Sequence, residues 1–225
     1  MTAAGRRVPA DRPFVLPDLT AFVGTSLEPR GDYDAIAFVE VDFTGQDAGD
    51  ARFLECHFER CALDGLSLRR ARVLGSLIAD AHGASVDLAD STWRDSEVRG
   101  GRLGAVQAPG AALTAVRFRG SKVGYLNLAG ANLDDITFDG CELGDIDARG
   151  ATLRAVRFIA CSIKELNVTE ARLSKVDLSG ATLSSLIGVD NLRGAIINQA
   201  QLVDLAPQLA AQLGLEVRPA PDPET

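Results

Sequence analysis

Aromatic residues and histidine are scarce in this sequence. Aromatic side chains make up 5% of the 225 residues, with one Trp, two Tyr and two His. Hydrophobic residues still reach 46%, as in folded proteins, so the core must be built mainly from Leu, Val, Ile and Ala. Histidine is the commonest general base and metal ligand in proteins. Its scarcity disfavours an enzyme or a metal protein.

The sequence also lacks excess positive charge and long apolar runs. It has 23 Lys and Arg against 31 Asp and Glu, a net charge of −8. A nucleic-acid binder needs a basic face, and an acidic chain is repelled by anionic membranes. No apolar run approaches the ~20 residues of a membrane span. No secretory signal is visible at the N-terminus. We therefore predict a cytoplasmic protein that binds neither nucleic acid nor membrane, with reduced cysteines.

The sequence does have a strict period of five. From Phe38 to Leu183, every fifth residue is large and apolar, with only four exceptions: Ala48, Gly83, Ala108 and Ala148. The residue two places before each is mostly small or apolar, and the other three are mostly polar. Neither a helix nor a simple strand has this period. A chain that turns a corner every five residues can bury two of them, and four corners close a square coil of about 20 residues.

A second, longer echo supports this coil. Phe118, Phe138 and Phe158 recur at this spacing, so we expect identical side chains to stack from coil to coil. Each small exception is followed ten residues later, on the opposite wall, by an aromatic residue. Gly83, for example, is followed by Trp93. Such pairing conserves core volume across the bore.

The segment Ala131-Asn132-Leu133-Asp134-Asp135 resembles the signature of the pentapeptide-repeat family, and repeats in the same frame extend over residues 36–187. The resemblance implies an all-β fold, a right-handed quadrilateral parallel β-helix of about 7.5 coils.

The flanking segments are predicted from composition. Residues 1–35 form an N-terminal segment, partly disordered, that caps the first coil, and residues 217–225 form a disordered tail. Residues 188–216 contain a helix over about 199–213, with a possible capping box between Asn198 and Gln201. One face of this helix carries Leu202, Leu205, Leu209 and Leu213. Because exposed apolar stripes mark interfaces, we predict a homodimer through this segment, or else a simple cap on the rod.

Candidate chemistry is sparse. Cys56, Cys61, Cys141 and Cys161 all fall in the small inward position. They read either as a metal or redox site or as small core residues. The core reading is favoured because no His accompanies them. We therefore predict no catalytic, cofactor-binding or metal-binding residues, no cofactor, and no enzymatic activity.

Acidic residues cluster between positions 134 and 147, with no Lys, Arg or His among them. This acidic girdle consists of Asp134, Asp135, Asp139, Glu142, Asp145 and Asp147. It reads either as a partner-binding patch or as a solvated surface laced with ion pairs between coils.

Two functions remain open from sequence. One is a protein-interaction scaffold of unknown partner, since solenoids present long regular faces. The alternative comes from a further resemblance, to the gyrase-protecting pentapeptide proteins. It implies an acidic rod that imitates DNA, binds DNA gyrase and confers fluoroquinolone resistance. Basic residues interrupt every column of acids that would imitate phosphates, so the scaffold is the preferred prediction.

Overall fold

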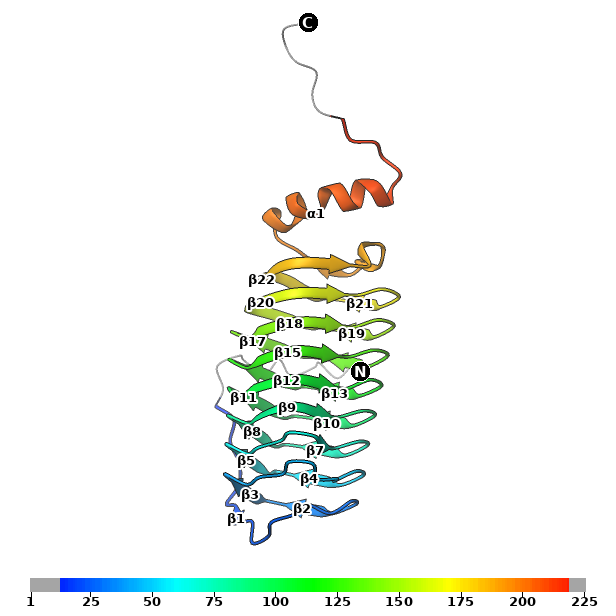
Figure 1. Cartoon of the computed structure of the whole chain (residues 1–225). Helices are drawn as coiled ribbons and strands as arrows, with labels where there is room; N and C mark the ends of the chain where they lie inside the picture. The colour runs from blue at the N-terminus through cyan, green and yellow to red at the C-terminus, as the bar shows by residue number, and fades with distance from the viewer. Residues whose placement is uncertain (1–12, 219–225) are drawn as a thin grey trace, which may run out of the picture.

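The chain winds into a rod. The computed structural model describes residues 13–218 and shows a parallel β-solenoid of about 9 turns followed by one short helix (Figure 1). The all-β, parallel β-helix class predicted from the period of five is thereby confirmed. Each strand pairs in parallel with the strand one coil later, as in Phe118 with Phe138. The predicted disorder of the extreme N-terminus lies outside the described residues, as does that of most of the tail.

The rod has four walls, each named here by its central inward residues. Wall 1 carries Phe38, Phe58 and their successors at 20-residue spacing, wall 2 Phe43 and Leu63, wall 3 Ala48 and Leu68, and wall 4 Phe53 and Val73. Walls 1 to 3 contribute to a 15-stranded sheet and wall 4 forms an 8-stranded sheet.

The strands of wall 4 are short and regular. They are β2 Asp32–Asp34, β4 Arg52–Leu54, β7 Arg72–Leu74, β10 Thr92–Arg94, β13 Ala112–Thr114, β16 Asn132–Asp134, β19 Thr152–Arg154 and β21 Arg172–Ser174.

Wall 1 and the corner between walls 2 and 3 hold the other strands. Wall 1 has β1 Thr20–Ala21, β3 Ile36–Val39, β5 His57–Glu59, β8 Leu77–Ala79, β11 Glu97–Arg99, β14 Arg117–Arg119 and β17 Thr137–Asp139. Walls 2 and 3 share β6 Leu66–Ser67, β9 His82–Asp87, β12 Arg102–Gln107, β15 Lys122–Asn127 and β18 Glu142–Asp147. Three strands complete the top: β20 Arg157–Asn167, β22 Val176–Ile187 and β23 Ala195–Ile196.

The core repeats from coil to coil. The rings of Phe118 and Phe138 stack with centroids 4.7 Å apart, and those of Phe138 and Phe158 at 4.9 Å. All three lie in register on wall 1, so the prediction of one stack is confirmed. Corners are turned by residues in the left-handed region, glycine at Gly130 and aspartate at Asp135. Both residue types tolerate that conformation better than others.

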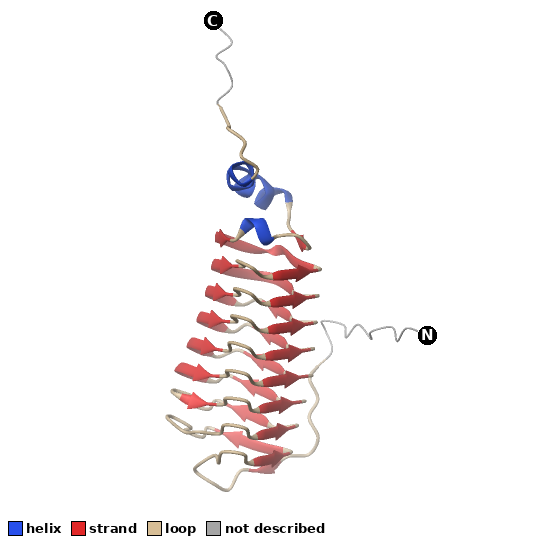
Figure 2. Ribbon diagram, turned by 90° about the vertical axis from the view of Figure 1, so that its right-hand side faces the viewer, coloured by secondary structure: helices blue, strands red, loops and turns tan. Residues whose placement is uncertain are grey.

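The N-terminal segment lies along wall 1. β1 adds a strand below β3, and Phe22 packs on Phe38 with ring centroids 4.8 Å apart. The residues that precede β1 lie along the side of the rod (Figure 2), and Phe14 lies beside Arg117. Outward positions on this wall are accordingly buried: Leu77 is 8% exposed and Glu97 0%. His57 is half-buried, and burial lowers its pKa.

The rod is longer than the predicted 7.5 coils. β1 and β2 precede the first predicted repeat, and β23 pairs with β22 after the pentapeptide frame has ended. Backbone pairing needs no side-chain period, so it continues where the sequence pattern has faded. The predicted count was therefore too low.

The upper end is closed by a short 3-10 helix η1, Val189–Asn191, and by helix α1, Gln199–Gln212. The predicted capping box of Asn198 and Gln201 is confirmed. The buried Gln201 side chain also donates to the carbonyls of Leu178 and Ala181, both at 2.8 Å. The helix thereby satisfies backbone groups at the open end of the solenoid. Over residues 13–218, no helix is long and apolar enough to cross a membrane.

Candidate functional site

Each acid of the acidic girdle has a basic partner. The six contacts are Asp134 with Arg154, Asp135 with Arg157 at 3.6 Å, Asp139 with Arg119 at 3.8 Å, Glu142 with Lys122 at 2.6 Å, Asp145 with Lys164 at 3.1 Å, and Asp147 with Arg149 at 2.7 Å.

These acids are spread around the coil rather than gathered on one wall. Five of the six basic partners come from a neighbouring coil; Arg149 alone comes from the same one. Asp147 is 8% exposed, and its hydrogen bonds from Arg149 lower its pKa. The acids of the other five ion pairs are more exposed to solvent than Asp147. Exposed ion pairs each contribute at most about 1 kcal/mol to stability. The girdle is thus a belt of ion pairs that presents little uncompensated negative charge.

The leucine stripe of α1 is divided between two environments. Leu205 is 7% exposed and Leu209 also packs against the core at the end of the rod. Leu202 is 49% exposed and Leu213 75%. Part of the stripe therefore covers the last coil, while the rest faces outward.

The exposed part of the stripe gives a sharper test of dimerisation. We expect the protein to be a homodimer by light scattering, and a Leu202→Asp, Leu213→Asp variant to be monomeric, because exposed apolar side chains drive association. Its melting temperature should stay close to that of the parent, since neither side chain packs on the rod. A control change of Asp204→Asn should leave the dimer intact. A monomeric parent protein would contradict the prediction.

The four cysteines lie in the core as predicted. Burial raises the pKa of Cys56 to about 11, and its thiol donates to the carbonyl of Tyr33 at 3.4 Å. A hydrogen bond to Cys161 together with burial raises the pKa of Cys141. Within residues 13–218, no three His, Cys, Asp or Glu side chains gather as metal ligands would. Buried thiols of raised pKa act as small apolar core residues.

A surface groove lies on wall 2 and was missed from sequence. This groove has a volume of about 770 Å³ and crosses several coils, from Asp64 to Ser162. Its floor carries no long side chains, because Ala84, Gly104, Gly124 and Gly144 follow one another up the rod. The backbone of β12, β15 and β18 is therefore directly accessible along the floor.

The glycine floor follows from how the chain passes the corner between walls 2 and 3. In the first coils this corner is turned by left-handed Gly45 and Gly65. In later coils β12, β15 and β18 run straight through it instead. Neighbouring coils then approach so closely that a Cβ on Gly104 would lie 2.5 Å from the carbonyl oxygen of Ala84. Glycine at this position accommodates the close approach without a clash.

The same clash recurs in the next two coils. A Cβ on Gly124 would lie 2.6 Å from the carbonyl oxygen of Gly104, and one on Gly144 would collide with that of Gly124. Above the groove, Lys164 and Ser184 occupy the equivalent positions, and the pair of Lys164 with Asp145 closes the upper end.

One rim of the groove is basic in its middle. His82, Arg102 and Lys122 lie in register on consecutive coils, followed by Glu142. Lys122 pairs with Glu142 at 2.6 Å, whereas Arg102 is exposed and has no ion pair within residues 13–218. Asp64, a carboxylate in the lower part of the groove, accepts hydrogen bonds from the backbone N–H groups of Ala84 and Ser85 at 3.2 Å. The groove therefore offers a local positive site on an acidic chain.

The signal for this groove was present in the sequence. Ala84, Gly104, Gly124 and Gly144 stand at the 20-residue spacing, one place after the central residue of wall 2. A column of small outward residues, rather than any motif, identifies the groove.

Corners every five residues and strand registers of 20 residues between coils define the architecture. The chain is a parallel β-solenoid with a repeat of five residues. No family model matches the sequence of this solenoid, and no curated protein matches it.

Solved structures resemble the solenoid only weakly. One is HetL, a pentapeptide-repeat protein involved in heterocyst differentiation regulation from the cyanobacterium Nostoc sp. strain PCC 7120. It is 16% identical with a TM-score of 0.27, covering 76% of this chain and 92% of HetL. Another is a trypsin-treated form of QnrB1, a plasmid-mediated fluoroquinolone resistance protein. It is 18% identical with a TM-score of 0.27, covering 89% of this chain and 98% of the other. Likeness at this level carries no argument about partner or activity.

Proposed function

We propose that this protein is a non-catalytic scaffold that binds an acidic segment of another protein in the groove on wall 2. The observation that carries the proposal is the groove itself, with its glycine floor and its basic rim at Arg102 and Lys122. A bare backbone floor lets a partner chain approach closely, and the rim selects its charge.

Charge complementarity identifies the partner's chemistry. The whole chain carries −8, so an acidic partner is repelled everywhere except where positive groups gather. Arg102 supplies a guanidinium that has no ion pair among the described residues 13–218, and Lys122 shares its charge with Glu142. Complementary charges accelerate and orient encounter, and repulsion elsewhere suppresses other docking modes. Both carboxylates that line the groove are engaged by neighbouring groups, which suits a binding surface.

A direct test uses a synthetic peptide of about ten glutamates as the probe, since such a polyanion has no affinity for an acidic surface without a local basic site. Fluorescence anisotropy should show binding at low salt that weakens as salt screens the rim. The variant Arg102→Glu, Lys122→Glu should weaken binding at least tenfold, about the effect of 1.4 kcal/mol.

The matched control is Arg172→Glu, Lys175→Glu, which makes the same change in net charge at two exposed positions by wall 4. It should bind the peptide within about twofold of the parent protein, a difference well under 1 kcal/mol. No binding by the parent, or equal loss in both variants, would refute the groove as the docking site.

The alternative, DNA mimicry toward DNA gyrase, is favoured by the rod shape and the net charge of −8. It is opposed by the acidic girdle, whose six acids all have basic partners. A gyrase supercoiling assay, with and without ciprofloxacin, separates the two proposals. A DNA mimic should inhibit supercoiling. Its variant with amides at Asp134, Asp135, Asp139 and Glu142 should inhibit several-fold less, because these charges would imitate phosphates. A scaffold directed to another partner should leave supercoiling unchanged.

A further inference from the structure

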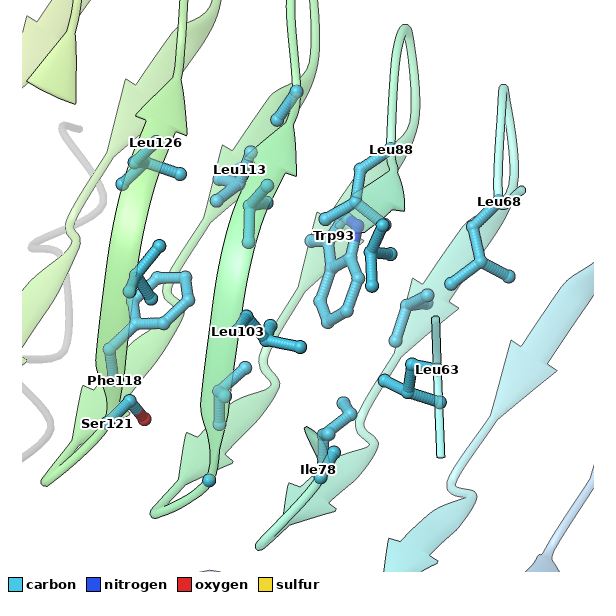
Figure 3. Close-up of a pocket in the computed structure, with 18 of the residues that line it drawn as sticks. Leu63, Leu68, Ile78, Leu88, Trp93, Leu103, Leu113, Phe118, Ser121 and Leu126 are labelled. Atoms are coloured by element: carbon cyan, nitrogen blue, oxygen red, sulfur yellow. The ribbon is translucent and has the colours of Figure 1, made fainter. Parts of the chain in front are cut away.

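The bore of the rod contains an apolar cavity of about 90 Å³ (Figure 3). It lies where aromatic residues run out: between Phe58 and Phe118 the sequence has a single aromatic residue, Trp93. The four central residues of the intervening coil are Val98, Leu103, Ala108 and Leu113, and none of them reaches far into the bore. Trp93 and Phe118, from the neighbouring coils, line the same space.

The few polar groups along this cavity are already satisfied. Trp93 Nε1 donates to Ser91 Oγ at 3.1 Å, and that hydroxyl donates to the carbonyl of Leu88 at 2.7 Å. The Ser121 hydroxyl donates to the carbonyl of Arg119 at 3.5 Å. A buried water needs two to four polar partners, and cavities lined only by apolar groups stay dry. The cavity therefore lacks the groups that would hold water and has lining atoms without packing partners.

The cavity lies against one corner of the rod. Gly100 and Gly101 form the corner between walls 1 and 2 in this coil, and both are partly exposed. Inward residues next to Gly100 and Gly101 are also partly accessible to solvent. On wall 1, Val98 and Phe118 are partly exposed, whereas Ile78 below them is 8% exposed and Phe138 above them 3%.

Wall 2 shows the same pattern. Leu103 and Val123 are partly exposed, whereas Leu63 is 7% exposed and Leu143 4%. Leu103 and Val123 also line the groove, so the cavity and the groove adjoin at these residues. The corner is thus where the cavity lies next to the groove.

We propose that this cavity binds a small apolar molecule that enters through the glycine corner at Gly100 and Gly101. An enclosed apolar space recovers lost dispersion contacts when an uncharged apolar molecule fills it. The volume is below the ~150 Å³ of an apolar cavity that admits benzene, so the ligand class is smaller than benzene. This site is separate in chemistry from the charged rim of the groove and does not depend on the proposed function.

Xenon is the probe for this site. Methyl resonances of the protein would be recorded under xenon and under helium at equal pressure, which separates binding from compression. Saturable shifts are expected for the methyl groups of Val98, Leu103 and Leu113, and not for those of Leu178 near the top of the rod. An absence of xenon-specific shifts at these methyl groups would overturn the proposal.

A filled variant makes the test specific. Val98 is in register with Phe118, so Val98→Phe should extend the stack of Phe118, Phe138 and Phe158 into the cavity. It should abolish the xenon shifts while the melting temperature is kept or raised. Ala108→Leu fills the space from the opposite wall and provides a second variant should the first fail to fold. Shifts that persist in a folded filled variant would place xenon elsewhere and overturn the proposal.

Discussion

Replacing Trp93 with alanine is expected to lower the free energy of unfolding by about 3–5 kcal/mol, the usual cost of deleting a large core side chain. The indole is 7% exposed and is the one aromatic group in the bore between Phe58 and Phe118. Its removal would enlarge the cavity next to it rather than let the core close, because the walls are held by strand pairing on both sides. Chemical denaturation monitored by circular dichroism gives the value.

Two variants calibrate this result. Trp93→Phe keeps most of the buried area and should cost clearly less than alanine. Val15→Ala removes an apolar side chain that is 79% exposed, and should change stability by no more than about 0.5 kcal/mol. A loss below about 1 kcal/mol for Trp93→Ala would show that the ring contributes little to the core.

A second large effect is expected at the buried ion pair on wall 1. Glu97 is fully buried although it points outward, and it contacts Arg99 at 2.6 Å and Arg117 at 3.3 Å. Arg117→Gln should cost about 3 kcal/mol, because it removes a partner from a carboxylate that cannot reach water. Glu97→Gln combined with Arg117→Gln should be less destabilised than Arg117→Gln alone, since no buried charge is then left with a partner missing.

The matched control is Arg119→Gln, two residues from Arg117 on the same strand. Arg119 contacts Asp139 at 3.8 Å, and both side chains are 34% exposed, so its loss should cost less than about 1 kcal/mol. Equal costs for the two arginine variants would show that burial of Glu97 adds nothing to its pairing energy.

The sequence predicts the walls of this rod far better than its surfaces. The period of five fixes which side chains point inward, and the 20-residue echo fixes their stacking, because both follow from hydrophobic patterning alone. The register of Phe118 on Phe138 could therefore be stated in advance. The extra length of the rod could not be predicted, because β1 and β23 join the sheet through backbone hydrogen bonds that leave no side-chain pattern.

The burial and pairing of outward side chains could not be predicted, for a different reason. Glu97 and His57 occupy outward positions of the repeat, but the N-terminal segment lies along their wall. No local sequence pattern indicates that contact. Five of the six ion pairs of the acidic girdle join residues on different coils, so the acids look clustered in sequence although each is compensated in space.

At Gly83 the structure supplies a reason for glycine that the sequence pattern does not contain. Sequence patterning predicts that this glycine leaves room for Trp93 across the bore. In the structure a Cβ at Gly83 would lie 2.9 Å from the backbone nitrogen of Asp64 and 3.0 Å from the carbonyl carbon of Leu63. Close approach between neighbouring coils therefore demands glycine at this position whatever lies opposite.

The strict register between coils limits how this protein can change in length. A deletion of five residues would preserve the repeat and the buried core, yet it would rotate everything above it by a quarter turn about the rod axis. Cut between His82 and Lys122, it would carry Lys122 and Glu142 to a neighbouring wall and split the groove. Only additions or losses of a whole coil, about 20 residues, keep the faces aligned. The rod should thus evolve in length by discrete steps, and each surviving step moves its upper surfaces along the axis by one strand spacing, about 4.8 Å.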